Sequence, residues 1–258
     1  LQREGLVQIE RIESENLGLG TRFTEITHLE HLLHRVSHAL DYLSQWEEKG
    51  LAQKMFAPKP QISALEREEV LNQDYTLVLD EVEKLEKEKS DTYSHVRFLE
   101  KEEDFLRPLE SLSLPLKSVS ATEATEVILG MMPLSSYQEL EDRAEDEAFW
   151  IHVISQGKRN VHILLACLSG QKEELQQILK QMNFYPLYFT DTMMEKAGDS
   201  GTVTDVLENI REEKARYGKR MESLEERGKE LASSREQLMR VHDVLLNERG
   251  KRLSSRNL

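Results

Sequence analysis

A seven-residue repeat of apolar side chains is the feature that most constrains how this chain folds. It lies within residues 203–253, where the intervening positions are mostly Glu, Lys, Arg, Ser and Gln. Its members are Ile210, Tyr217, Leu224, Leu231, Leu238 and Leu245. This spacing predicts one long exposed helix with a single narrow apolar stripe. Such a helix cannot bury its stripe alone, so it needs a partner helix of similar length.

A second repeat upstream supplies a partner helix. Its members are Leu71, Val78, Leu85, Leu99 and Leu106, with Thr92 at the position between 85 and 99. Each repeat covers about 50 residues, or roughly 75 Å at the helical rise per residue. Because residues 111–202 lie between the repeats, we expect an antiparallel pair of helices with a small domain at its distal tip.

The second heptad position of the returning helix is less regular than the first. It holds Leu207, Lys214, Met221, Gly228, Arg235 and His242. Most of these are poor core residues. We therefore expect a straight, modestly stable pair of helices, suited to spanning distance more than to tight dimerisation.

Composition and charge narrow the function classes. The chain has 258 residues, of which 38% are apolar, 6% aromatic and 32% charged, which is too few apolar residues for one compact globule. A net charge of −14 argues against binding nucleic acid, or an anionic membrane through a basic surface. The single Cys167 cannot form an internal disulfide, which favours a reducing compartment. With no long apolar span or secretion signal in the sequence, we expect a soluble cytoplasmic segment.

Residues 1–60 are predicted to form a partial proximal lobe, with a short strand at 6–12 and an amphipathic helix from Ile26 to Trp46. Between them, Leu-Gly-Leu-Gly-Thr at 17–21 resembles a phosphate-binding loop only superficially. A dinucleotide fingerprint would need Gly in place of Phe23, and the Gly-Lys-Ser/Thr of a P-loop is absent. We interpret 17–21 as a flexible turn.

Four histidines lie along the amphipathic helix, at His28, His31, His34 and His38. The last three fall within about 60° on the helical wheel, a geometry that can hold a metal. They lie opposite the apolar stripe, with no Cys or Asp beside them. We therefore interpret them as solvent-exposed surface histidines rather than metal ligands.

The outgoing coiled-coil helix is assigned to residues 61–110. It follows a hinge that contains Pro58 and Pro60, and it ends at Pro108 before a Ser-rich link. The returning coiled-coil helix is assigned to residues 203–258. Thr202 and Asp205 have the spacing of its N-terminal cap.

Residues 111–202 are predicted to form a distal α/β lobe. Strands are expected at 126–131, 149–155, 160–168 and 184–189, with a hairpin at 156–159. Ser136 with Glu139, and Ser169, are expected to cap the two helices. The order strand, helix, strand, strand, helix, strand is typical of ferredoxin-like domains. The fold class is therefore α+β, with a ferredoxin-like βαββαβ lobe on a long antiparallel two-helix coiled coil.

No constellation in the sequence indicates catalysis or a cofactor, and we predict a non-enzyme with no catalytic, cofactor or metal residues. The acidic run at 139–147 is interpreted as a solvated helix face. Cys167 lies in an apolar segment where a buried, inert thiol is expected. His152 and His162 are expected to be structural. Partner contacts are predicted at Met131, Met132, Met193 and Met194, with core filling as the alternative for the first two.

Three segments carry a resemblance to a known family. Leu-Gln-Arg-Glu-Gly-Leu-Val-Gln-Ile-Glu at 1–10 resembles the early helix, glycine and strand of subunit I, also called subunit a, of rotary V-type and archaeal-type ATPases. Val-Ile-Leu-Gly-Met-Met-Pro at 127–133 is similar to the strand of that family that ends in Gly-x-x-Pro. Residues 175–189, with Met-Asn-Phe before a strand, and the long helix after Gly201 and Thr202, resemble its next section. The resemblance covers essentially the whole chain.

The resemblance implies a non-catalytic stator arm on the cytoplasmic face of a membrane. In that family the arm links the membrane ion channel to peripheral stalks made of E and G subunits, and so resists rotor torque. It implies as partners E and G heterodimers, other subunits of the rotary ATPase and the chain's own membrane domain, with no cofactor and no nucleic acid. The sequence starts inside the first lobe and stops before any membrane helix, so no ion-channel residue is assigned.

The competing class is a free-standing coiled-coil tether or scaffold with a hinge domain. Such proteins usually carry a nucleotide-binding head, for which this sequence has no motif. A metal hydrolase that uses the histidine helix is a more distant alternative. The resemblance does not distinguish proton from sodium ion transport, ATP synthesis from ATP-driven pumping, or the number of stalks bound.

Overall fold

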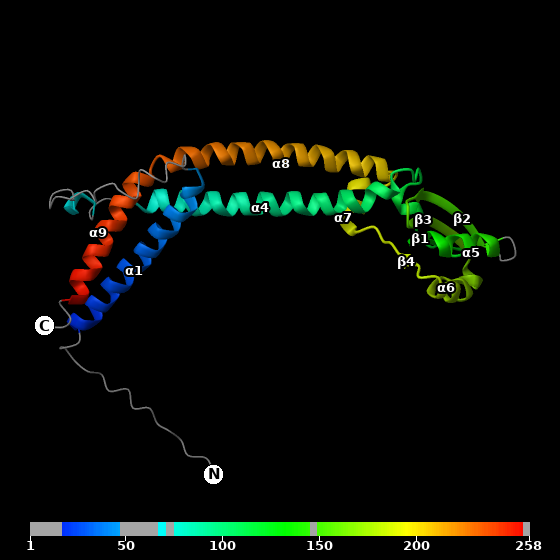
Figure 1. The fold of residues 1–258 in the computed structure, drawn as a ribbon, viewed down its shortest axis with the longest axis horizontal. Helices are drawn as coiled ribbons and strands as arrows, with labels where there is room; N and C mark the ends of the chain where they lie inside the picture. Colours follow the sequence, from blue (N-terminus) through cyan, green and yellow to red (C-terminus); the bar gives the residue numbers. More distant parts are fainter. Residues whose placement is uncertain (1–16, 47–66, 71–74, 145–148, 255–258) are drawn as a thin grey trace, which may run out of the picture. The chain divides into compact units, whose positions relative to one another are not determined.

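The computed structural model describes residues 17–46, 67–70, 75–144 and 149–254. The predicted strand at 6–12, the hinge with Pro58 and Pro60, and Leu71 lie outside these residues. Helices and one four-stranded antiparallel sheet make up the described chain, which confirms the α+β class. The chain divides into two compact units, and Figure 1 labels the helices and strands of both. The first unit is Leu1–Ser90 with Glu222–Leu258, and the second unit is Asp91–Met221; the four segments predicted from the sequence stay a prediction.

Most of the heptad positions on the two long helices, α4 (Thr76–Leu106) and α8 (Val203–Ala232), are buried. Their buried members are Leu85, Thr92, Leu99, Leu106, Ile210 and Leu224. In the second unit, Lys214 of α8 pairs with Glu103 of α4, and Tyr217 stacks on His95. From the first contact to the second, the residue number rises along α8 and falls along α4, so the two segments run antiparallel within this unit.

The predicted continuous helix at 203–258 is wrong. Helix α8 ends at Ala232, and α9 (Arg235–Ser254) begins after a turn at Ser233 and Ser234. The Ser233 hydroxyl donates to the Glu230 carbonyl at 2.6 Å, the local competition by which serine weakens a helix. After the turn, Leu238 and Leu245 pack against α1 (Leu17–Leu43) in the first unit.

The predicted turn at 17–21 is also wrong, because α1 begins at Leu17. Two glycines in a first turn cost helix stability, roughly 1 kcal/mol each. Helices in proteins are stabilised mainly by packing of their apolar face. Leu29, Leu33, Val36 and Leu43 of α1 are all buried against α9 and α4 in the first unit. The helix predicted from Ile26 is confirmed to Leu43, where a 3-10 turn at Ser44–Trp46 follows.

The sheet of the second unit contains β1 (Thr125–Pro133), β2 (Phe149–Gln156), β3 (Asn160–Leu168) and β4 (Tyr185–Pro186). Helix α5 (Leu134–Ala144) follows β1, and α6 (Lys172–Gln181) follows β3. The order of elements is the predicted one, and the strands lie in the order β2-β3-β1-β4. Its central pair aligns Thr125 with Leu168 and Pro133 with Asn160.

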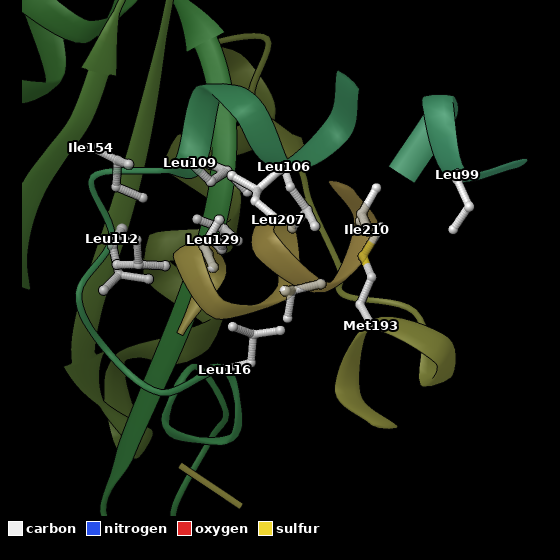
Figure 2. Close-up of a cluster of buried hydrophobic side chains, with 13 residues drawn as sticks. Leu99, Leu106, Leu109, Leu112, Leu116, Leu129, Ile154, Met193, Leu207 and Ile210 are labelled. Atoms are coloured by element: carbon white, nitrogen blue, oxygen red, sulfur yellow. The ribbon is translucent and has the colours of Figure 1, made fainter. Parts of the chain in front are cut away.

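Each face of the sheet supports one hydrophobic core. On one face, Met132, Ile163 and Leu165 pack against α5 and α6. On the other face, Leu129 and Leu164 pack against residues of α4 and α8 and of the connection between α4 and β1. Figure 2 shows this second core, which contains Leu129 together with Leu106, Leu109, Leu116, Leu207 and Ile210. The sheet is thereby buried on both faces over part of its area.

Two of the predicted helix caps differ from the structure. Ser136 lies inside α5, which begins two residues earlier at Leu134, and the Leu134 N–H donates to the Arg159 carbonyl. Ser169 lies in a 3-10 turn, and its hydroxyl donates to the Glu123 carbonyl. The third predicted cap is confirmed: the Thr202 N–H and hydroxyl both donate to the Asp205 carboxylate, at 2.7 and 2.8 Å, where α8 starts.

Two of the segments that carry the family resemblance meet in the sheet. A side chain at Gly130 would place its Cβ 2.0 Å from the Phe184 ring, so only glycine leaves room for that ring. Asn183 has a φ of +53°, a conformation that Asn tolerates better than most residues, and it directs the chain from α6 to Phe184. Gly130 of the Gly-x-x-Pro segment therefore packs against Phe184 of the Met-Asn-Phe segment.

Candidate functional site

The four methionines predicted to contact a partner do not share one surface. Met132 is fully buried in the core with α5 and α6, and Met193 of α7 (Asp191–Ala197) is buried in the other core. Met132 therefore fills the core, the alternative that the sequence left open. Met131 and Met194 are half-buried. Only these two keep part of their side chains accessible in this structure.

The histidines of α1 lie on its exposed face, as predicted. His28, His31, His34 and His38 are all exposed, and His38 Nε2 lies 3.4 Å from a Glu86 carboxylate oxygen. Across the part of the chain that the structure describes, no three His, Cys, Asp or Glu side chains come together as a metal site. Nothing in the arrangement of α1 gives these imidazoles a shared ligand.

Three other side chains that can carry chemistry, Cys167, Tyr137 and His162, are buried or half-buried in the lobe. Cys167 is buried in the core with α5 and α6, and burial raises the pKa of its thiol, which keeps the thiol protonated and unreactive. The Tyr137 hydroxyl donates to Glu141 at 2.7 Å, and burial together with this carboxylate raises the pKa of Tyr137 to about 12. His162 is half-buried beside the Ser155 hydroxyl, and burial lowers its pKa. Burial thus favours the neutral form of each of these three side chains.

A buried ion pair holds α7 against α4 in the second unit. Glu102 of α4 has only 4% of its side chain exposed, and it accepts from Lys196 Nζ and Thr192 Oγ1, each at 2.7 Å. Lys196 also lies 3.5 Å from Glu213 of α8. The pattern of the outgoing repeat did not predict this group, although Glu102 lies three residues after Leu99, on the apolar side of the helix, where an acidic residue needs a partner.

The same heptad position is acidic in the first unit. Glu81 and Glu88 of α4 both accept from Arg227 of α8, at 2.9 and 3.1 Å. In the second unit, Glu103 accepts from Lys214 at 2.7 Å, and these hydrogen bonds lower the pKa of Glu103. Polar residues between α4 and α8 are thus paired across the helices, which fixes the register of each helix segment more than it stabilises it.

Gly228 is the site where a 3-10 turn packs against α8 in the first unit. A Cβ there would lie 2.2 Å from Cζ2 of Trp46. The Trp46 indole N–H donates to Glu225 at 2.7 Å, and Lys89 Nζ lies 4.7 Å from the ring centroid. Lys89 also pairs with Glu225 at 2.5 Å. Gly228, which the sequence suggested to be a poor core position, is where the Trp46 ring packs against α8.

An open groove lies in the second unit beside β1, β4 and α6. Its volume is about 700 Å³. Apolar side chains line most of it, among them Val119, Val127, Leu187 and Met194, while Lys172 and Lys180 of α6 lie at its polar side. Together with exposed Tyr188 beside it, the groove is the best candidate contact site of this unit.

Comparisons with known proteins rest on structure alone. No family model matches the sequence, and no curated protein matches it. Among solved structures, the chain is similar to the crystal structure of the cytoplasmic N-terminal domain of subunit I, a homologue of subunit a, of V-ATPase. The chain shares the fold of that domain. The TM-score is 0.58 at 14% identity, and the match covers 90% of this chain and 72% of the subunit I domain.

The similarity to subunit I agrees with the family resemblance stated from the sequence, and confirms it at the level of the fold. None of the described helices is both long enough and apolar enough to cross a membrane.

Proposed function

We propose that this chain is the non-catalytic stator arm of a rotary V-type or archaeal-type ATPase. The observation that carries the proposal is the shared fold with the cytoplasmic domain of V-ATPase subunit I over 90% of the chain. The resemblance of residues 127–133 and 175–189 to that family supports it independently of the overall fold. In this role the chain links a membrane ion channel to peripheral stalks during ATP-driven proton or sodium ion transport or ATP synthesis.

The architecture proposed for the arm is an antiparallel coiled coil between the outgoing segment 61–110 and the returning segment 203–258, with a break in the returning segment at Ser233 and Ser234. A ferredoxin-like lobe at 111–202 forms its distal tip, and residues 1–60 belong to a membrane-proximal lobe. The sheet order β2-β3-β1-β4 and the two helices on one sheet face support the ferredoxin-like assignment. Ion pairs between α4 and α8 in each unit support the coiled coil.

The proposed partners are E and G heterodimers of the peripheral stalk, other subunits of the rotary ATPase, and a membrane domain of the same protein. The arm would lie on the cytoplasmic face of the membrane. Residues 111–202 carry 7 Lys or Arg against 13 Asp or Glu, so the matching stalk surface should be basic or the contact largely apolar. Of the four predicted contact methionines, Met131 and Met194 remain candidates for this contact, because they are half-buried.

A single small lobe buries too little area for tight binding, so its affinity for one stalk should be roughly micromolar. Firm attachment would come from several such contacts acting together. Each contact can then be weak while the assembled stator resists torque.

Hydrogen exchange of the full chain, with and without a purified E and G heterodimer, tests the docking site. We expect slowed amide exchange within residues 111–202. Slowing confined to residues outside that range would overturn the assignment of the lobe as the docking site. If no interaction is found at concentrations 100-fold above the expected, roughly micromolar Kd, the free-standing tether is favoured.

A deletion variant gives a second readout. The Leu116 N–H donates to the Gly201 carbonyl at 3.0 Å, so the two ends of a deletion of residues 118–200 lie close enough for a short linker. Calorimetry should show that the deletion abolishes the distal contact, and undiminished binding would contradict the proposal. Helical circular dichroism of the variant checks that α4 and α8 remain folded.

A further inference from the structure

The edge of the sheet next to the groove is incomplete. Strand β4 pairs with β1 only at Gly130–Pro186 and Met131–Tyr185. One more bond follows, in which the Leu187 N–H donates to the Leu129 carbonyl at 2.9 Å. The chain then leaves the sheet for Thr190, the N-cap of α7. Within the described ranges, no strand accompanies β1 further on this side.

The main-chain groups of Val127 point to this open edge. In an antiparallel strand, the N–H and C=O of one residue point to the same side, and successive residues alternate. Leu129 accepts from the β4 side, whereas the Ala124 carbonyl accepts from Ser169 on the β3 side. Val127, two residues before Leu129, therefore directs its N–H and C=O away from β3. Thr125, the next residue on this side, is already bonded to Thr122 at 2.7 Å.

The groove has two chemically different walls beside that edge. Val119, Val127 and Leu187 give one wall an apolar surface. Along the other wall, Lys172, Gln176 and Lys180 of α6 are spaced four residues apart, and so lie on one side of the helix. A strand placed beside β1 would direct alternate side chains to these two walls.

The charge of the α6 wall is positive. Lys172 pairs with Glu126 at 2.8 Å, which neutralises one lysine. Lys180 is exposed, and the one acidic residue of the groove lining, Glu126, is the partner of Lys172. The lining thus holds two lysines against one glutamate, although residues 111–202 as a whole are acidic. A ligand with carboxylates on the side that faces α6 would complement it.

We propose that this groove binds a short extended segment of a partner protein, which adds as a strand to β1 at Val127. The segment alternates apolar residues, which face Val119 and Val127, with acidic residues, which face Lys180. Strand addition of this kind takes affinity from main-chain hydrogen bonds and specificity from alternate side-chain pockets. The inference does not depend on the stator assignment, because a stalk could dock elsewhere on the lobe.

The probe is a fluorescein-labelled hexapeptide of alternating leucine and glutamate, titrated into the full chain and followed by anisotropy. A peptide of alternating leucine and lysine is the charge control. We expect the acidic peptide to bind and the basic peptide to bind at least about twofold more weakly, the range of an exposed ion pair. Lys180→Glu should weaken the acidic peptide by a similar factor. Lys158→Glu, in the β2–β3 hairpin, is the matched control and should leave it unchanged.

Val127→Pro tests strand addition, because it removes only an N–H that points out of the sheet, where proline is tolerated. Val127→Ala loses the same packing but keeps the N–H. We expect the proline variant to bind the acidic peptide about 3- to 10-fold more weakly than the alanine variant, the effect of one hydrogen bond. In the native chain, peptide binding should slow hydrogen exchange of the Val127 amide.

Three results would overturn the proposal. They are no binding of the acidic peptide at millimolar concentration, equal binding by the proline and alanine variants, and an unchanged Val127 amide in a saturated complex. Equal binding of the acidic and basic peptides would overturn the charge preference. If the peptide does not bind while the E and G heterodimer still docks, this inference is refuted and the stator assignment is not.

Discussion

Replacing Gly228 by alanine should destabilise the protein, although alanine is the better helix former. Gly228 lies within α8, where an exposed Gly→Ala change gains about 1 kcal/mol. At this position the new Cβ would lie 2.2 Å from Cζ2 of Trp46, far inside the contact distance of two non-bonded carbon atoms. The clash involves atoms of the rigid Trp46 indole ring, so the whole ring has to move to make room for the new methyl group.

The size of the effect follows from what the ring loses. Overpacking of this kind costs about 1 to 3 kcal/mol. The Trp46 hydrogen bond to Glu225 adds about 1 kcal/mol or more, and its contact with Lys89 adds roughly 0.5 kcal/mol. After the gain in helix propensity, we expect a net loss of about 2 kcal/mol. For a protein of this size that loss lowers the Tm by about 4 to 8 °C.

Gly218→Ala is the matched control in the same helix. Nothing lies within 4 Å of a Cβ at Gly218, so this change should raise the Tm by about 2 to 4 °C. Thermal unfolding followed by circular dichroism compares the two variants. In a Trp46→Ala background the clash is gone, so Gly228→Ala should then stabilise, which a double-mutant cycle measures. Equal effects of the two glycine variants in the native background would refute the packing of Trp46 on Gly228.

Two further predictions concern the ion pairs of the second unit. Lys196→Met should lower the free energy of unfolding by about 3 kcal/mol, because Glu102 is left charged and buried; adding Glu102→Gln should restore part of the loss in urea unfolding, and no restoration would contradict the pairing. Lys214→Met should cost about 1 kcal/mol at pH 7. The folded-state pKa of Glu103 is lowered below its ordinary value of 4.5, so its stabilisation is present above that pH and is lost as pH falls through the lower value; an unfolding difference that persists at pH 2 would disprove the link to Glu103.

Periodicity predicted the buried positions of the long helices well. Leu85, Leu99, Ile210 and Leu224 are buried because a seven-residue spacing places them on one side of a helix, whatever the partner is. The same reasoning treated Gly228 as a weak position, because a scheme of two helices contains no third element. Trp46 lies 179 residues from Glu225, and no local pattern announces that contact.

Local signals predicted the order of the strands but not their ends. The apolar run after the hairpin signal at 156–159 predicted β3 with the bounds that it has, Asn160–Leu168. The segment 184–189 is similarly apolar, yet β4 contains only Tyr185 and Pro186, since the chain turns away to cap α7 at Thr190. That early departure opens the groove at Val127. The candidate site therefore depends on where the chain leaves the sheet, which local sequence patterns do not predict. For a related reason, the sequence did not show that Met132 and Met193 face the cores, while partner contact by Met131 and Met194 stays a prediction.

Affinity capture of the tagged chain from its own cells, with cross-linking before solubilisation, tests the stator assignment most directly. The account predicts capture of the E and G subunits of a rotary ATPase, with cross-links that start from lysines of residues 111–202, such as the exposed Lys158 and Lys180. Capture that contains no rotary ATPase subunit would contradict the assignment, and would favour a free-standing tether.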